Sequence, residues 1–106
     1  MEILTLSKPL KVNGNDVSEL RADFDAITTQ DFMQASAEAS AAATRAGGVM
    51  LGVEFDAGLH VALTCRAIIR AMPEMDLLDL RRITGRDVLQ LQRAGRNFCF
   101  GGLSEG

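Results

Sequence analysis

The chain has 106 residues with 11 basic and 14 acidic side chains, so its formal net charge is −3. A content of 47% hydrophobic and 24% charged residues is typical of one globular domain with a single core, and it argues against a disordered chain. The acidic balance argues against non-specific nucleic-acid binding, and no apolar run approaches the roughly 18 residues of a membrane span. The N-terminus has no signal-peptide pattern either, so we expect a cytoplasmic protein.

Residues 2–24 predict a β-hairpin. Apolar residues alternate with polar ones on both sides of Asn13-Gly14, a pair that tolerates the positive φ angles of a tight hairpin turn. Pro9 lacks a backbone N–H and therefore marks an edge position or a bulge. We expect the hairpin tip at Asn13–Asp16.

Residues 25–46 predict a helix. Thr28 precedes Asp31 by three residues, the spacing of a capping box in which each side chain binds the other residue's backbone N–H. Ile27 and Phe32 are spaced as a hydrophobic staple around that start. The body is rich in alanine, which favours helix and buries little area, so this helix should pack lightly or very closely.

The middle of the chain is ambiguous between residues 47 and 58, where glycines interrupt apolar residues. Either a short strand or a hinge between helices fits this pattern, and the hinge is favoured. From residue 57 to 72 apolar residues recur at helical spacing, and Pro73 should end that helix.

The last third predicts a short turn followed by a helix over residues 84–98. Thr84 and Asp87 repeat the Thr-x-x-Asp start signal, and Asp87 is interpreted as a charge that favours the helix start. Residues 99–106 are rich in glycine and are expected to form a flexible tail.

Together these elements predict an α+β fold, with an N-terminal β-hairpin followed by a small bundle of three or four helices. The whole chain, residues 1–106, forms one domain. Its parts are a hairpin over residues 1–24, a helical part over 25–98 and a tail over 99–106.

The sequence contains few groups suited to catalysis or metal binding. His60 is the single histidine, and its place at the start of a helix predicts either a partly exposed or a core-edge position. Cys65 lies on an apolar helix face, and Cys99 is 34 residues away, so both are interpreted as buried apolar side chains. One histidine and two separated cysteines do not make a zinc site. We therefore predict no catalytic, cofactor-binding or metal-binding residues and no enzymatic activity.

Arginines near the C-terminus are the best candidates for a binding site. Arg86, Arg93 and Arg96 could form a basic strip that binds an acidic partner, and Phe100 and Leu103 could dock in a segment that orders on binding. The alternative is that Arg93 and Arg96 are merely solvated, while Arg81 and Arg82 pair with Asp76 and Asp79. Residues 1–46 hold 4 basic and 7 acidic side chains and residues 76–106 hold 5 and 4, so head-to-tail self-association is also plausible.

The order of these features resembles a known family. The run from Ile3 to Leu10, followed by Val12, Gly14, Val17 and Leu20, and then the run from Ile27 to Phe32, resembles the opening of the small tail assembly chaperones of long-tailed phages and prophages. A closing helix that begins at Thr84-x-x-Asp87 and runs to Phe98 is similar too. The chain departs from the family pattern at residues 21–25 and 47–58.

The resemblance implies a non-enzymatic role in tail morphogenesis. Such chaperones bind the tape-measure protein and tail-tube subunits, are absent from the finished virion, and are often also made in a longer frameshifted form. The alternatives are a structural tail adaptor or terminator protein and a small helical DNA-binding regulator that would use Arg86, Arg93 and Arg96. The expected partners are therefore proteins, including a second copy of this chain, and neither nucleic acid nor membrane.

Overall fold

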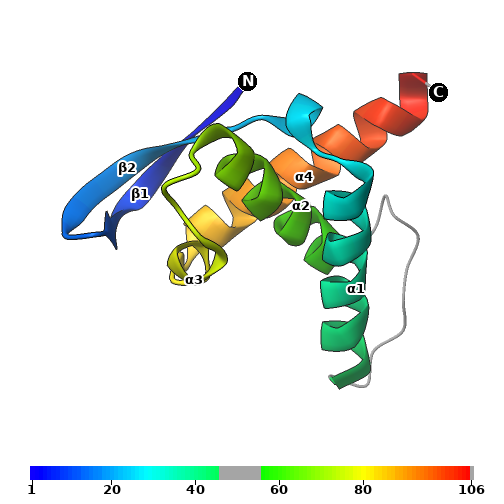
Figure 1. The fold of residues 1–106 in the computed structure, drawn as a ribbon, viewed down its shortest axis with the longest axis horizontal. Coiled ribbons are helices and arrows are strands. Elements are labelled where there is room, and N and C mark those ends of the chain that lie inside the picture. Colours follow the sequence, from blue (N-terminus) through cyan, green and yellow to red (C-terminus); the bar gives the residue numbers. More distant parts are fainter. Residues whose placement is uncertain (46–55, 106) are drawn as a thin grey trace.

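The computed structural model describes residues 1–45 and 56–105 and confirms the α+β fold, with a two-stranded antiparallel hairpin followed by helices (Figure 1). The described elements are β1 (Glu2–Val12), β2 (Asn15–Ala22), the short 3-10 helix η1 (Phe24–Ala26), α1 (Thr29–Arg45), α2 (Ala57–Ala71), α3 (Leu77–Leu80) and α4 (Arg86–Glu105). In Figure 1 the hairpin lies at one side and α1 at the other, with α2 and α4 crossing between them.

The hairpin turn is formed by two residues with positive φ, Asn13 at 52° and Gly14 at 83°, as the Asn-Gly pair predicts. Thr5 pairs with Glu19 and Leu10 pairs with Val17, so the register shifts between these two pairs. Pro9 lies in that irregular stretch, which confirms its predicted place at a bulge.

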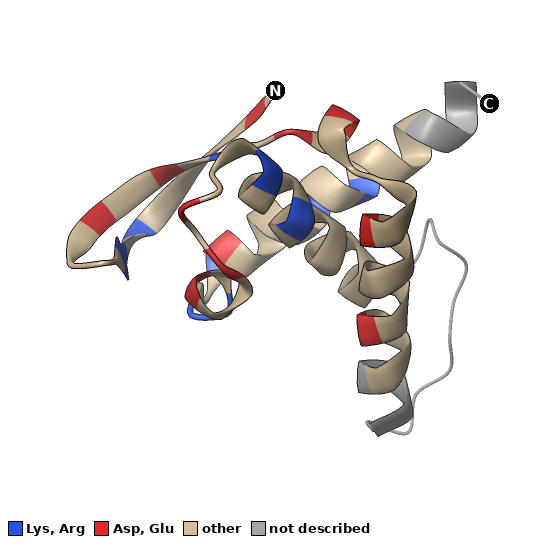
Figure 2. Cartoon of the chain, in the orientation of Figure 1, with Lys and Arg blue, Asp and Glu red and all other residues tan. Residues whose placement is uncertain are grey.

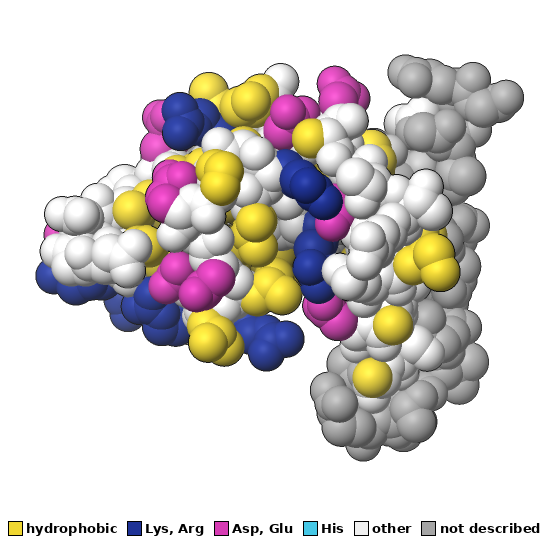
Figure 3. Space-filling model, viewed as in Figure 1, with side chains coloured by type: hydrophobic (Ala, Val, Ile, Leu, Met, Phe, Trp, Pro, Cys, Tyr) yellow, Lys and Arg dark blue, Asp and Glu magenta, His cyan; other side chains and the backbone are white. Residues whose placement is uncertain are grey.

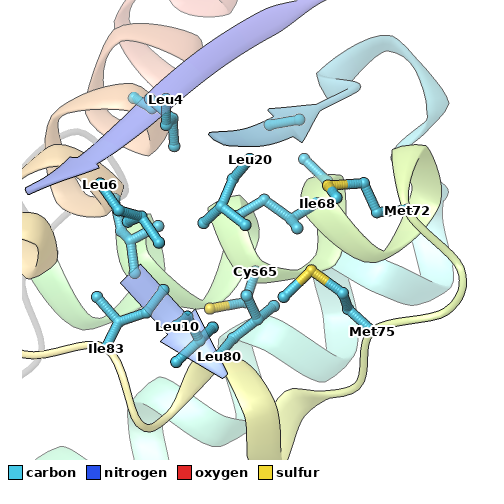
Figure 4. Close-up of a cluster of buried hydrophobic side chains, with 14 of the residues drawn as sticks. Leu4, Leu6, Leu10, Leu20, Cys65, Ile68, Met72, Met75, Leu80 and Ile83 are labelled. Atoms are coloured by element: carbon cyan, nitrogen blue, oxygen red, sulfur yellow. The ribbon is translucent and has the colours of Figure 1, made fainter. Parts of the chain in front are cut away.

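Helix α2 lies at the centre of the molecule, because it contacts β2, η1, α1, α3 and α4. Leu63, Thr64 and Ile68 on this helix are completely buried. In Figure 4, leucines of the hairpin meet Cys65 and Ile68 of α2, and Met75, Leu80 and Ile83 close the cluster from the α3 region. This cluster is the main core and joins the sheet to the helices.

Helix α1 begins with the predicted capping box. The Asp31 N–H donates to Thr28 Oγ1 at 3.1 Å, and the Thr28 N–H donates to Asp31 Oδ2 at 3.1 Å. Arg70 of α2 donates from Nε and Nη2 to the two oxygens of the same carboxylate, at 2.9 and 3.0 Å. Ala35 and Ala39 are buried against α2, so the alanine-rich helix packs closely.

The C-terminal elements differ from the sequence prediction. Helix α3 begins with its own capping box, in which the side chains of Asp76 and Asp79 each accept the other residue's backbone N–H. Helix α4 begins at Arg86, after Gly85 with φ +64°, and continues to Glu105. The predicted end at Phe98 is therefore wrong, and the stretch expected as a flexible tail is helical through residue 105.

The stretch 47–58, for which the sequence allowed a strand or a hinge, lies mostly outside the described residues. Its last part is described. Asp56 caps α2 by accepting the Leu59 N–H at 3.1 Å, and Ala57 and Gly58 already belong to that helix.

The crossing of α2 and α4 depends on one glycine. A Cβ at Gly95 would lie only 2.0 Å from the carbonyl oxygen of His60, so α4 approaches the backbone of α2 too closely for any side chain there. The Thr64 hydroxyl lies 2.9 Å from the same oxygen and 2.6 Å from the carbonyl oxygen of Leu91, so it can donate to either helix at their crossing.

We expect Gly95→Ala to destabilise the fold by about 1–3 kcal/mol, because the added methyl group forces the two helix backbones apart. The measurement is urea denaturation followed by circular dichroism. Gly101→Ala is the matched control on the same helix, since a Cβ there meets no atom within 4 Å. It should be neutral or stabilising by up to about 1 kcal/mol, through helix propensity alone. Equal losses in the two variants would contradict the close crossing.

Candidate functional site

The predicted binding residues gather on the solvent-facing side of α4. Arg86, Arg93 and Arg96 are exposed and Phe100 is partly exposed, at intervals of three, four or seven residues that place them on one helix face. Leu89 lies on the same face with 60% of its surface exposed. We call these five residues the α4 ridge. The side chain of Leu103 lies outside the described residues, although its backbone belongs to α4.

The three arginines of the ridge are not used to hold the described part of the chain together. The ion pairs found there involve Lys11, Arg66, Arg70 and Arg82 instead. The Arg96 guanidinium lies over the Phe100 ring at 5.1 Å from its centroid, a cation–π geometry that favours an ordered pair on the surface. The ridge therefore combines unpaired positive charge with exposed apolar surface.

The alternative interpretation of the arginines is confirmed for one pair. Arg82 Nη2 donates to Asp79 Oδ1 at 2.8 Å, as expected. The expected pairing of Arg81 is wrong, since Arg81 forms none of the ion pairs among the described residues.

The orientation of the ridge is fixed by Asp87, in the first turn of α4. Its carboxylate accepts the Ser7 N–H at 2.9 Å, the Lys8 N–H at 3.2 Å and the Ser7 hydroxyl at 3.1 Å. Gln90 Nε2 also donates to it at 3.0 Å. The sequence predicted a capping box with Thr84, but the hydrogen bonds of this carboxylate go to β1. Asp87 therefore ties the start of α4 to the bulge of the hairpin.

Other side chains cover the same edge of β1. Gln90 Nε2 donates to the carbonyl oxygen of Thr5 at 2.8 Å, and Arg82 Nη2 donates to that of Lys11 at 2.7 Å. An uncovered strand edge would invite pairing with another chain. With β1 bound along one side of α4, the ridge is left facing solvent.

Hydrogen-bond donors that lie close in space stabilise the charged form of three carboxylates, Asp31, Asp79 and Asp87. Backbone N–H donation from Ser7 is the main cause that lowers the pKa of Asp87 below its ordinary value of 3.8. The Arg70 guanidinium lowers the pKa of Asp31, and backbone donation from Asp76 lowers that of Asp79. The carboxyl groups of Asp31, Asp79 and Asp87 are therefore ionised at neutral pH, and the hydrogen bonds that they accept depend on their negative charge.

Figure 2 shows how charge is distributed over the fold, with basic residues on α2, on α4 and at the lower end of the hairpin. The dark blue side chains at the junction of α1 with the rest of the molecule in Figure 3 have acidic neighbours. Here Arg70 pairs with Asp31 and Arg66 pairs with Glu38. The open hollow at this junction, about 480 Å³, is thus lined by charges that already have partners.

The groups weighed for catalysis lie in the core. His60 is 1% exposed, so the expectation of partial exposure is wrong, because α4 crosses directly over it at Gly95. Its Nδ1 lies 3.1 Å from Gln92 Nε2. Burial raises the pKa of the Cys65 thiol to about 11, which disfavours the reactive thiolate. Cys65 and Cys99 are both buried, as expected.

The described residues contain neither a metal-binding cluster nor a membrane-spanning helix. No group of three or more His, Cys, Asp or Glu side chains in residues 1–45 and 56–105 is arranged to hold a metal ion. None of the helices in that part of the chain is long and apolar enough to cross a membrane.

Comparison with known proteins finds no matching family model, no matching curated protein and no matching solved structure. Assignment of a function to this chain therefore depends on its own residues and on the resemblance described above.

Sequence reasoning missed two parts of this site. Leu89 stands at helical spacing between Arg86 and Arg93, so the periodicity of the arginines was a signal that could have included it. The partners of Asp87 lie 79 and 80 residues away along the chain, and no local pattern indicates a contact over that separation.

We expect Asp87→Asn to lower the urea midpoint of the protein at pH 7, because the amide presents a donor to backbone N–H groups that need an acceptor. Glu74→Gln is the control, since Glu74 is exposed and forms none of the ion pairs found in the described chain. It should leave the midpoint unchanged.

The wild-type protein should also lose stability in acid. A carboxyl group with a lowered pKa in the folded state stabilises the fold above its unfolded pKa, about 3.9 for aspartate, and this contribution is lost as pH falls through the folded pKa. Denaturation curves measured from pH 6 downward should show Asp87→Asn approaching the wild type at the lowest pH. A constant gap between the two proteins would mean that the carboxylate charge is not what holds β1.

Proposed function

We propose that this chain is a non-enzymatic tail assembly chaperone of the kind that its sequence resembles. In this role it binds the tape-measure protein and tail-tube subunits in the host cytoplasm during tail morphogenesis and is absent from the mature particle. The observation that carries the proposal is the α4 ridge, where three arginines that form no ion pair with the described carboxylates flank exposed Leu89.

The chemistry of the ridge supports binding of an elongated protein partner. Exposed apolar side chains provide contact area, and arginines contribute orientation and the rejection of wrong partners through charge complementarity. A helix with apolar residues along one face and acidic residues beside them matches this surface. Long helices of that kind are what a chaperone must keep from aggregating before they are assembled.

The alternative role in phage tail assembly is a structural tail adaptor or terminator protein. The two roles differ in what happens after assembly, because an adaptor remains in the particle and a chaperone leaves it. Mass spectrometry of purified mature particles separates them. Detection of the chain at a fixed copy number would support the adaptor and contradict the chaperone.

We expect Leu89→Glu to reduce co-purification of a co-expressed phage tape-measure protein by at least about tenfold, because it places a charge in the apolar part of the ridge. Leu78→Glu on α3 is the matched control, since Leu78 is 69% exposed and lies outside the ridge. The measurement is recovery of the untagged partner with the tagged chain after co-expression. Equal recovery with both variants would contradict a docking role for the ridge.

A further inference from the structure

An acidic surface lies beside the α4 ridge. Glu2 of β1, together with Asp23 and Asp25 at η1, lines one hollow of about 220 Å³ at the open end of the hairpin. We call these three residues the acidic shoulder. They take no part in the ion pairs of the described chain, and the Asp23 side chain makes no capping hydrogen bond to η1.

The shoulder and the ridge are continuous. Glu2 also lines a second hollow, of about 180 Å³, whose other wall includes Arg93 and Asn97 of α4. The Phe24 ring stacks on Phe98 with 5.0 Å between the centroids, so η1 rests directly on α4. In Figure 2 the acidic segments near the N-terminus and at η1 accordingly lie close to α4.

A surface that carries a basic patch beside an acidic patch is complementary to a second copy of itself. When two copies are related by a two-fold axis, the basic half of each meets the acidic half of the other, and both contacts form at once. An acidic partner helix pairs only with the ridge, so it competes with a second copy for that half of the surface, whereas the second copy pairs with both halves. The pairing of adjacent opposite charges therefore favours a copy of the same chain.

Exposed apolar side chains lie in both halves of this surface. Met1, which is 76% exposed, lines the same hollow as the shoulder, and Leu89 is 60% exposed on the ridge. They supply area whose removal from water favours association, while the charges set the relative orientation of the two copies.

We propose that the chain forms an isologous dimer in which Arg93 and Arg96 of each copy contact the acidic shoulder of the other. This inference goes beyond the proposed function and does not depend on it, because it concerns the chain alone.

The test is a charge swap measured by sedimentation velocity at low salt. Arg93→Glu/Arg96→Glu makes the ridge acidic, and Asp23→Lys/Asp25→Lys makes the shoulder basic. Each variant alone faces like charge at both contacts, so its dimer should dissociate at least about tenfold more readily than that of the wild type. An equimolar mixture of the two variants restores opposite charge at both contacts and should form a heterodimer.

Control variants carry single charge reversals of the same sign elsewhere. Arg81→Glu, just after α3, and Asp16→Lys, near the hairpin turn, alter exposed residues outside the surface and should leave the dimer intact. Circular dichroism shows whether every variant is folded. A wild type that stays monomeric at all concentrations, or a mixture that yields no heterodimer, overturns the proposal. Because no partner protein is present in this assay, its failure is distinct from failure of the chaperone role.

Discussion

The carboxylate of Asp87 is the interaction on which the candidate site depends. It accepts two backbone N–H groups and one hydroxyl from the irregular stretch of β1, at a place where the strand has left its regular ladder with β2. Without an acceptor these N–H groups would have to reach water or stay unsatisfied. One side chain thus stabilises the bulge, anchors the first turn of α4, and leaves the ridge on the solvent side.

The second constraint is the close crossing of α2 and α4 at Gly95. It explains why chemically capable side chains in this protein have structural roles. His60 lies under the crossing, the single Thr64 hydroxyl can donate to a backbone oxygen of α2 or of α4, and Cys65 belongs to the apolar core. Close packing gains contact area and removes these three side chains from solvent.

Local elements of the fold could be predicted because their causes are local. The Asn13-Gly14 turn, the Thr28–Asp31 capping box and the helix that ends before Pro73 each follow from residues within a few positions. The predicted end of the last helix at Phe98 was wrong, because glycine content was weighed above continuity of the helix. The candidate binding face could be predicted in part. Arginine spacing indicated it, but the contribution of Leu89 depended on knowing which face is exposed.

The sequence by itself determined the class of fold, the helix and turn signals, the uneven distribution of charge, and the resemblance that motivates the chaperone proposal. The tertiary structure alone decided the burial of His60, the partners of Asp87, and the neighbourhood of the acidic shoulder with the ridge. The physical reason is the separation along the chain of the residues that interact. Capping and turn formation depend on backbone groups three or four residues apart, whereas these contacts join segments dozens of residues apart, and only packing brings them together.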